Sequence, residues 1–251
     1  MNIIAVTQAR IGSSRLPGKV LKTIGGISIL EIHLRRLLTS KRVNKLKVAT
    51  TLESGAVAIC NIARQLEVDC YCGDMDDVLD RFYQAVKDEH PDYIVRITSD
   101  CPLIDADLID ELIAFAVTNR LDYASNTLVQ TFPDGLDAEV FTFKALEKAW
   151  NEATLQSDRE HVTPYIWRNS TFKGGQLFVS DNLGNSGGFG NLRITIDEEA
   201  DFQLLQHLIS ELGIKAGWKD YVQHLDKHPE IAHINSHIIH NEGYLKSLKK
   251  D

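Results

Sequence analysis

The fold is decided by the amino-terminal stretch, which reads Asn2-Ile-Ile-Ala-Val-Thr7 and continues as Gln8-Ala-Arg-Ile-Gly-Ser-Ser-Arg-Leu-Pro-Gly-Lys19. The first run is apolar and partly β-branched, which predicts a short buried strand. A loop rich in glycine, serine and proline follows, and apolar residues then recur at helical spacing over residues 29–38. A strand, a loop and a helix in this order indicate an α/β protein.

Strands and helices keep alternating up to residue 120. Further strands are predicted at residues 46–51, 68–72 and 93–98, and further helices at residues 54–66, 76–87 and 105–117. Ser54 and Asp105 are suited to cap the first and the last of these helices. Because ligands of mostly parallel sheets bind beyond the carboxyl ends of the strands, the first loop, residues 73–77 and residues 99–102 should line one crevice.

The second half of the chain is less regular. It predicts strands at residues 139–143, 176–180 and 192–196, helices at residues 144–152, 158–168 and 199–212, and a polar helical tail from residue 217. Residues 181–190 contain four glycines and are expected to form a flexible loop. Since no internal repeat or Pro/Ser-rich linker occurs, we expect one domain spanning residues 1–251 with an inserted subregion.

The composition is typical of a globular protein, with 43% hydrophobic and 25% charged residues among 251. The net charge of −8 argues against a nucleic-acid groove. The apolar runs are too short for a membrane helix, and the amino terminus lacks the pattern of a signal peptide. We therefore expect a cytoplasmic location with neither a nucleic-acid nor a membrane partner.

Four cysteines stand at positions 60, 70, 72 and 101. Cys70 and Cys72 lie two residues apart in a predicted strand and should point to the same face. No second pair stands at the spacing of a zinc site, so we expect reduced, mostly buried thiols.

The loop after the first strand carries three cations within ten residues: Arg10, Arg15 and Lys19. Arginine binds phosphate oxygens through a two-pronged fork, and lysine binds them as a point charge. We therefore predict that the loop holds a nucleoside triphosphate. The alternative interpretation is a basic surface turn.

Glycines and serines complete this loop, but it matches neither common phosphate motif. Gly12 and Gly18 allow close backbone approach, and Ser13 and Ser14 offer hydrogen-bond donors. Five residues separate the two glycines and Val20 follows the lysine, whereas a Walker A loop has four residues between its glycines and Ser or Thr after its lysine. The dinucleotide-binding pattern Gly-x-Gly-x-x-Gly is absent as well.

Asp100 and Asp197 each follow an apolar run at a predicted strand end. A carboxylate that faces a bound triphosphate is a natural Mg²⁺ ligand, so we predict that these two residues hold the metal. Each also has a structural alternative. Asp100 could form a turn before Pro102, and Asp197 could cap the helix from Glu199.

Two further pairs of residues are candidates for binding the acceptor of the reaction. Asp137 and Glu139 project from the same side of an extended chain, where they could bond sugar hydroxyls or approach the metal. Arg159 and His161 could bind an anionic acceptor. A turn entering a strand and a capped, solvated helix start are the respective alternatives.

Five histidines occupy the tail, at positions 224, 228, 233, 237 and 240. His233 and His237 are four residues apart, but no Glu stands where a His-Glu-x-x-His zinc site requires it. A polar surface or a partner-facing helix is the favoured interpretation.

Six segments in fixed order carry a family resemblance. They are Gln8-Ala-Arg-Ile-Gly-Ser-Ser-Arg-Leu-Pro-Gly-Lys-Val20, Gly73-Asp-Met-Asp-Asp-Val-Leu-Asp-Arg-Phe82, Arg96-Ile-Thr-Ser-Asp-Cys-Pro-Leu103, Pro133-Asp-Gly-Leu-Asp-Ala-Glu-Val-Phe141, Arg159-Glu-His-Val-Thr-Pro-Tyr165 and Arg193-Ile-Thr-Ile-Asp197. In these segments the chain resembles the SpsF-like cytidylyltransferases, named for spore coat polysaccharide biosynthesis protein F and related to the CMP-Kdo and CMP-sialic acid synthetases.

This resemblance implies a Rossmann-like, three-layer nucleotide-diphosphosugar transferase fold, related to GT-A glycosyltransferases, with a mixed, mostly parallel sheet. It implies a cytidylyltransferase that uses CTP and Mg²⁺ to activate a sugar or sugar acid for surface polysaccharide biosynthesis. The irregular subregion at about 125–192 would then serve acceptor binding and formation of a homodimer. Residues 134–140 differ from the better-studied synthetases, so their acceptor pocket cannot be transferred to this chain.

The resemblance also implies roles for individual residues. Arg10, Arg15 and Lys19 match triphosphate-binding positions, and Asp100 and Asp197 match Mg²⁺ positions. Nucleotide contacts are expected at Ala9, Gly12, Ser13 and Ser14 in the loop and, for the base and ribose, at Val78, Leu79 and Arg81.

In the mechanism we expect, an acceptor hydroxyl or phosphate oxygen attacks the α-phosphorus of CTP in line. Mg²⁺ held by Asp100 and Asp197 would neutralise charge between the α-phosphate and the acceptor, and the three cations of the loop would stabilise the departing pyrophosphate. Two other interpretations stay open: a GT-A-type glycosyltransferase that uses a nucleotide sugar, and a non-catalytic nucleotide-binding subunit. The nearest candidates for the Asp-x-Asp motif of the former are Asp74-Met-Asp76 and Asp105-Ala-Asp107.

Overall fold

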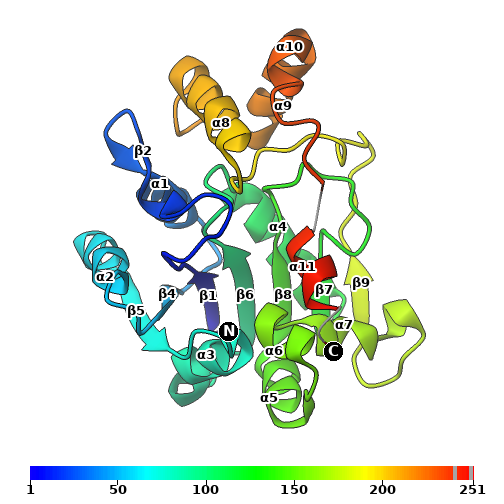
Figure 1. The fold of residues 1–251 in the computed structure, drawn as a ribbon. Coiled ribbons are helices and arrows are strands. Elements are labelled where there is room, and N and C mark those ends of the chain that lie inside the picture. Colours follow the sequence, from blue (N-terminus) through cyan, green and yellow to red (C-terminus); the bar gives the residue numbers. More distant parts are fainter. Residues whose placement is uncertain (240–241, 249–250) are drawn as a thin grey trace.

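A seven-stranded sheet forms the centre of the computed structural model, which describes residues 1–239, 242–248 and 251 (Figure 1). Its strands are β1 (Ile3–Gln8), β4 (Lys45–Thr51), β5 (Asp69–Gly73), β6 (Tyr93–Thr98), β7 (Tyr123–Ser125), β8 (Glu139–Thr142) and β9 (Ser180–Asn182). The strand order is β5-β4-β1-β6-β8-β7-β9. Strand β8 is antiparallel to both neighbours and the other pairs are parallel, which confirms the mixed, mostly parallel sheet.

Helices connect these strands. They are α1 (Ile29–Leu37), α2 (Ala56–Gln65), α3 (Val78–Val86), α4 (Ala106–Thr118), α5 (Phe143–Glu152), α6 (Gln156–His161), α7 (Pro164–Arg168), α8 (Glu199–Leu212), α9 (Trp218–Lys227), α10 (Pro229–Ala232) and α11 (Glu242–Ser247). Three short 3₁₀ helices, η1 (Lys19–Leu21), η2 (Lys87–Glu89) and η3 (Thr171–Lys173), and a hairpin of β2 (Thr23–Ile24) and β3 (Ile27–Ser28) complete the described elements.

Of the two predicted helix caps, one is right. The Asp105 carboxylate accepts hydrogen bonds from two backbone N–H groups at the start of α4, as expected. The cap predicted at Ser54 is wrong, because α2 begins only at Ala56 and has no side-chain cap at Gly55.

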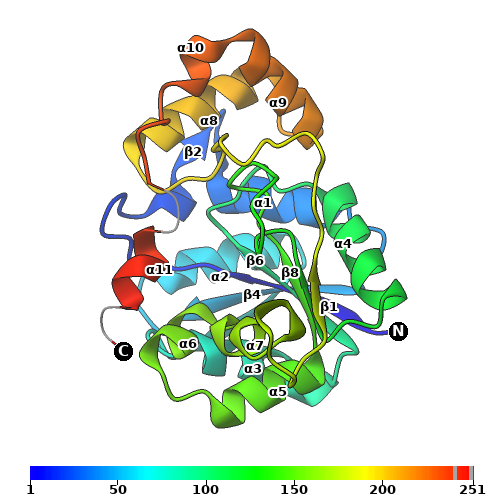
Figure 2. The same ribbon diagram turned by 90° about the vertical axis from the view of Figure 1, so that its right-hand side faces the viewer.

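The sheet is covered on both faces, with α1, α2 and α4 on one side and α3, α5, α6 and α7 on the other (Figure 2). The alternation of strand side chains explains this arrangement. In β1, Ile3 and Ala5 join the apolar cluster under the first group of helices, whereas Ile4 and Val6 join the cluster under the second. An apolar run without polar alternation therefore becomes a central strand.

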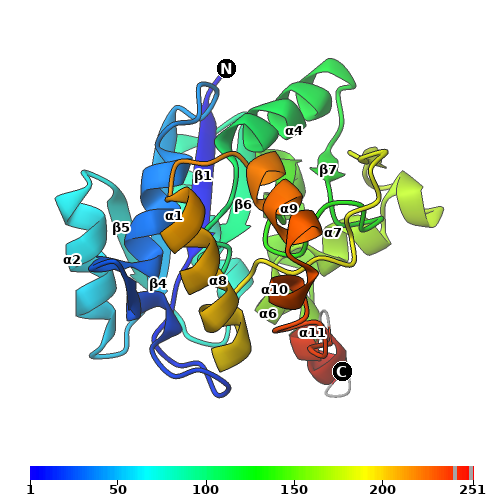
Figure 3. The same ribbon diagram turned by 90° about the horizontal axis from the view of Figure 1, so that it is seen from above.

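A third apolar cluster lies between α1 and the C-terminal helices. Ile29 and Ile32 of α1 pack in one cluster with Leu204 and Leu208 of α8 and Tyr221 of α9. Seen from above, α8 and α9 lie over the sheet beside α1 (Figure 3). Among the described residues, no helix is both long enough and apolar enough to cross a bilayer.

Two of the predicted strands in the second half are wrong. Residues 192–196 form no named strand. Their pairing is an isolated bridge between Arg193 and Asp134, because they lie against a loop instead of the sheet. Strand β9 begins at Ser180, at the very end of the run predicted at 176–180. The predicted helix over 158–168 is likewise broken: Val162 adopts a φ of 72°, and Pro164 then begins α7.

The thiols also differ from expectation. Cys101 is buried and free, as predicted. Cys60 and Cys70 instead form a disulfide, and Cys72 is exposed. The reason is tertiary: α2 packs over the edge strand β5 and brings Cys60 to the two cysteines that share one face of that strand.

Candidate active site

A cavity of about 760 Å³ opens where β1, β5 and β6 end. Its lining comes from the ends of these strands and the segments that follow them, and from parts of residues 127–139, 156–173 and 193–197. Tyr123, Ile239, Tyr244 and Ser247 complete it. The structure thus brings the three predicted loop segments together. The predicted site residues that line the cavity are Ala9, Arg10, Gly12, Ser13, Ser14, Arg15, Lys19, Val78, Arg81, Asp100, Asp137, Glu139, His161 and Asp197. Leu79 and Arg159 do not line it.

Local hydrogen bonds fold the loop after β1 back on itself. The backbone N–H groups of Ser13 and Gly18 both donate to the Ile11 carbonyl, at 2.9 and 3.2 Å. The Ser13 hydroxyl in turn accepts from the Leu16 N–H at 3.2 Å. Gly18 has a φ of 66°, a left-handed conformation that favours glycine, and it directly precedes η1, where Lys19 stands. The glycine turn therefore sets where the lysine side chain begins.

The centre of the site is the ammonium group of Lys19. Its Nζ donates to Asp100 Oδ2 at 2.8 Å, to Asp197 Oδ1 at 2.9 Å and to the Ile196 carbonyl at 2.9 Å. Burial alone would lower the pKa of Lys19, but the charges of the two carboxylates outweigh it and raise that pKa. Burial would likewise raise the pKa of Asp100, but the Lys19 charge and hydrogen bond keep it below its ordinary value. The ammonium of Lys19 and the carboxylate of Asp100 are therefore held charged.

A buried arginine holds the second carboxylate of this cluster. Arg193, whose side chain is 4% exposed, donates to Asp197 Oδ2 at 2.9 Å, to Asp201 Oδ1 at 2.8 Å and to Asp134. Asp201 and Glu198 form the capping box of α8, so Asp197 is not the N-cap of that helix. The helix-cap alternative for Asp197 is therefore wrong, and its carboxylate faces the cavity.

The other two predicted cations differ from each other. Arg15 forms ion pairs with Asp197 at 3.1 Å and with Glu198 at 3.5 Å. Arg10 is exposed at the cavity and, within the part of the chain that the structure describes, has no hydrogen bond or ion pair. Arg10 is therefore the cation of this loop that is most available to an incoming anion.

Asp137 lines the same cavity, close enough to Asp134 and Asp100 to feel their charges. Its Oδ1 atom is buried and has no hydrogen-bond partner among the described residues. Burial raises the pKa of Asp137 to about 8, and the charge of Asp134 adds to the shift. A buried carboxyl oxygen without a partner is costly, which makes it suited to a ligand that supplies the missing hydrogen bond.

Glu139 has a different environment, although it is only two residues away. Its carboxylate accepts hydrogen bonds from Arg96, from the Tyr123 hydroxyl at 2.6 Å and from the Thr163 hydroxyl at 2.6 Å. These partners occupy both oxygens of a residue that is 7% exposed. Glu139 therefore positions Arg96 at the cavity wall and has little capacity left for an acceptor.

His161 lines the same side of the cavity. Its Nε2 lies 2.9 Å from the Ser247 hydroxyl, and its ring meets the edge of Tyr244 with centroids 5.2 Å apart. Burial, and secondly the charge of Arg96, lower the pKa of His161 to about 4. The imidazole is thus neutral near pH 7 and can offer a hydrogen bond but not a positive charge.

The residues expected to contact the base and ribose lie on different faces of α3. Val78 and Arg81 are three positions apart in α3 and reach the cavity, whereas Leu79 is fully buried in the core. Arg159 lies outside the cavity because its guanidinium binds the carboxylate of Asp77, the N-cap of α3, at 3.0 Å. Arg159 therefore stabilises the start of that helix.

Gly135 lets two acid-bearing segments meet. It has a φ of 110°, and a Cβ atom there would lie 2.6 Å from the backbone of Ile194 and Thr195. The backbone N–H of Ile194 donates to the Asp134 carbonyl at 2.7 Å. Any larger residue would force apart the segments that carry Asp137 and Asp197.

Arg96 and Arg193 are functional-site residues for which the sequence predicted no role. Each stands within an apolar run, Tyr93-Ile-Val-Arg-Ile-Thr98 and Leu192-Arg-Ile-Thr-Ile196. A charge in a buried strand is costly unless it is paired, so these two arginines did signal buried acidic partners.

The histidine run is not assembled on one helix. Helix α10 ends at Ala232, before His233, and His240 lies outside the described residues. His207 and His224 approach each other with Nε2 atoms 3.1 Å apart, but the described histidines do not join any group of three metal-binding side chains.

Comparisons with known proteins find similar chains. The family model described as "Cytidylyltransferase" matches residues 4–215. An uncharacterised protein of Methanocaldococcus jannaschii is 42% identical over 95% of this chain and 96% of its own length. The spore coat polysaccharide biosynthesis protein SpsF of Bacillus subtilis is 28% identical over 92% of this chain and 97% of its own. A cytidylyltransferase structure from Leptospira borgpetersenii superposes with a TM-score of 0.88 at 34% identity, covering 96% of this chain and all of that one.

Proposed function

This chain belongs to the cytidylyltransferase family, and we propose that it transfers CMP from CTP to a sugar or sugar acid for surface polysaccharide biosynthesis. The observation that carries the proposal is the convergence of Lys19, Asp100 and Asp197 at one end of a cavity that Arg10 also lines. Nucleotidyl transfer needs this combination, because charge must be neutralised and the reacting groups held in place.

The nucleotide would lie along the loop after β1 and the start of α3. Arg10 is the available cation for the triphosphate, and the glycine and serine residues of the loop bring backbone close to its oxygens. Lys19 and Arg15 would stabilise the departing pyrophosphate. Their ion pairs with Asp100 and Asp197 would also hold these carboxylates in place. Val78 and Arg81 would contact the base and ribose.

The residues present fit Mg²⁺. Asp100 and Asp197 already converge on a shared positive charge, the Lys19 ammonium, and hard carboxylate oxygens are the ligands that Mg²⁺ prefers. Lys19 contacts Asp100 through Oδ2, and the Oδ1 of that residue has the weak Cys101 thiol as its neighbour at 3.8 Å. When bound, Mg²⁺ would supply Lewis-acid neutralisation of phosphate charge.

The acceptor would lie against Asp137, Arg96 and His161, which line the same cavity. Asp137, with an unpartnered oxygen, would bond an acceptor hydroxyl, while Arg96 and the neutral His161 would orient polar groups of the sugar. Glu139 would contribute by holding the Arg96 side chain at the cavity wall.

In the reaction an acceptor oxygen forms a bond to the α-phosphorus, and the bond from that phosphorus to the β-phosphate oxygen breaks. Pyrophosphate leaves with the electron pair, and the proton of a hydroxyl acceptor passes to water or a basic group. The protein residues position both partners and hold positive charge beside the leaving group.

The test is pyrophosphate release with each of four nucleoside triphosphates and a panel of sugar acids, sugars and sugar phosphates. Release with CTP and one acceptor class is the expected result. A nucleoside diphosphate released from a nucleotide sugar would instead support the glycosyltransferase. CTP binding without pyrophosphate from any acceptor would support a non-catalytic subunit.

A homodimer and a cytoplasmic location are further parts of this proposal. Sedimentation of the purified chain tests the first, and fractionation of the source cells tests the second.

A further inference from the structure

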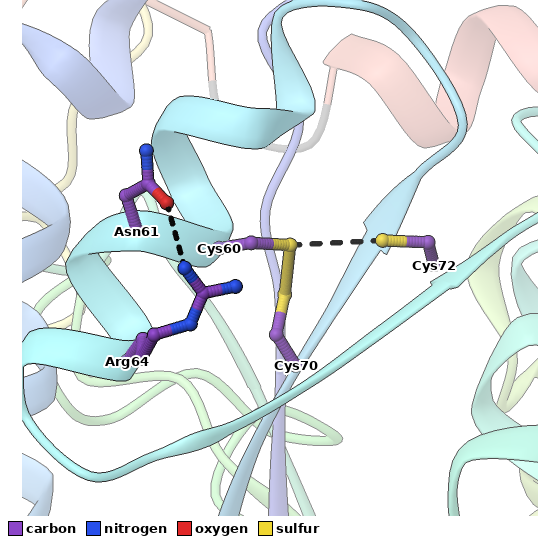
Figure 4. The surroundings of a disulfide bond; sticks show 5 residues. All are labelled: Cys60, Asn61, Arg64, Cys70 and Cys72. Carbon is purple, nitrogen blue, oxygen red and sulfur yellow. Dashed lines mark hydrogen bonds between the residues drawn. A yellow bond between two sulfur atoms is a disulfide. The ribbon is translucent and has the colours of Figure 1, made fainter.

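A cluster of three cysteines lies on the surface at the edge of the sheet, away from the cavity. Strand β5 pairs with β4 in a register that puts Cys70 beside Val48 and Cys72 beside Thr50, so both sulfur atoms leave the strand on one face. Helix α2 covers that face and contributes Cys60 (Figure 4). None of the three lines the cavity.

The sulfur atoms are close enough to share one ligand. Cys60 and Cys70 form a disulfide, the Sγ atoms of Cys60 and Cys72 are 3.6 Å apart, and all three sulfur atoms lie within 4.8 Å of one another. Three thiolates on a tetrahedral Zn²⁺, with Zn–S bonds of about 2.3 Å, would lie about 3.8 Å apart. The separation of Cys60 and Cys72 therefore already fits a shared metal ion.

We propose that, once the disulfide is reduced, Cys60, Cys70 and Cys72 form a binding site for a thiophilic cation such as Zn²⁺. A phosphine and water reduce the disulfide to two thiols and yield the phosphine oxide. Binding then replaces the protons of the three thiols with the metal. Sulfur donors select such soft or borderline ions over Mg²⁺.

The fourth position of a tetrahedral ion would belong to water. No fourth His, Cys, Asp or Glu joins this group within the part of the chain that the structure describes, and Cys72 opens the site to solvent. Cys60 and Cys70 are half-buried and come from two different elements. The metal would thus tie α2 to the edge strand, as the disulfide does in the oxidised chain.

The experiment uses the full chain reduced with a phosphine under anaerobic conditions, with all four thiols verified by titration. Excess Mg²⁺ occupies the carboxylates of the cavity. Co²⁺ is added first, because thiolate-to-cobalt charge transfer in the near ultraviolet arises only from sulfur ligation. Zn²⁺ is then titrated against a chromophoric chelator.

We expect one equivalent of either metal, with the Co²⁺ charge-transfer band displaced by Zn²⁺. Cys72→Ser, at an exposed cysteine outside the disulfide, should lower the Zn²⁺ affinity at least about tenfold and weaken the band. Cys101→Ala changes the buried cysteine that does not belong to the cluster, and it should leave the Zn²⁺ affinity and the Co²⁺ band unchanged. Asp100→Asn, in the cavity, should leave them unchanged as well. Absence of a thiolate band in the reduced chain, or an unaltered affinity in Cys72→Ser, would overturn the proposal.

Discussion

We name the two proposed parts of the cavity the nucleotide wall, with Lys19, Asp100 and Asp197, and the acceptor wall, with Asp137 and Glu139. Their charged residues differ in how they are paired. On the nucleotide wall, the ammonium of Lys19 contacts the carboxylates of both Asp100 and Asp197. On the acceptor wall, Glu139 is saturated by structural partners, whereas Asp137 keeps an oxygen without a partner. Two carboxyl groups only two residues apart therefore differ in their capacity to accept a further hydrogen bond from a ligand.

The largest effect is expected where the nucleotide wall meets the core, at Arg193. Arg193→Ala would leave the carboxylates of Asp134, Asp197 and Asp201 without their common partner, which should lower the free energy of unfolding by about 3–5 kcal/mol. Urea denaturation measures this change in the free energy of unfolding. Arg35→Ala, at an exposed arginine paired with Glu31 within a helix, is the matched control and should cost less than about 1 kcal/mol. Equal losses would show that Arg193 does not organise the wall.

The second-largest effect is expected at the cluster of Lys19, Asp100 and Asp197. Asp100→Asn and Lys19→Ala should each reduce the rate of pyrophosphate release by about 10²- to 10³-fold, because each removes a preorganised charge. Steady-state kinetics with CTP and saturating Mg²⁺ measure the change. Asp107→Asn, an exposed acid at the start of α4, should keep normal turnover. Near-normal rates in both cluster variants would refute the assignment of this wall.

The buried histidine behind the nucleotide wall predicts a pH effect on stability. His33 contacts the Thr7 hydroxyl at 2.8 Å and the Cys101 carbonyl at 2.9 Å, and burial lowers its pKa from 6.5 to about 4. The neutral form is favoured in the folded chain. This contribution is therefore complete above pH 6.5 and is lost as the pH falls towards 4, by up to about 3 kcal/mol.

Urea unfolding at a series of pH values from 7 to 4 checks this effect. His33→Gln should flatten the profile over that range. A wild-type profile with the same slope as the variant would assign the acid sensitivity to other groups.

The smallest effect is expected on the acceptor wall. Asp137→Asn keeps the shape of the side chain but alters its hydrogen bonding, so the KM for the acceptor should rise about tenfold while the KM for CTP stays constant. Asp181→Asn, at an exposed position of β9, is the control. A rise in the KM for CTP instead would place Asp137 on the nucleotide side and remove the contrast between the walls.

The sequence predicted the first wall better than the second for a physical reason. In the first half, strands alternate with helices, so the residues after each strand necessarily meet at one edge. That logic located Lys19 and Asp100 from local pattern alone. Beyond residue 120 this alternation ends: β7, β8 and β9 still join the sheet, but residues 192–196 pair only through an isolated bridge to Asp134.

What the sequence by itself determined is the α/β architecture and the family of the chain, because periodicity and short motifs are local properties. Only the tertiary structure decided which of these side chains have bonding partners and which do not. Lys19 and Arg15 are bound by carboxylates while Arg10 is not. The Oδ1 of Asp137 has no partner while both oxygens of Glu139 do, and Cys60 meets two cysteines of a neighbouring strand. Hydrogen-bond partners come from segments distant in sequence, so no local pattern can count them.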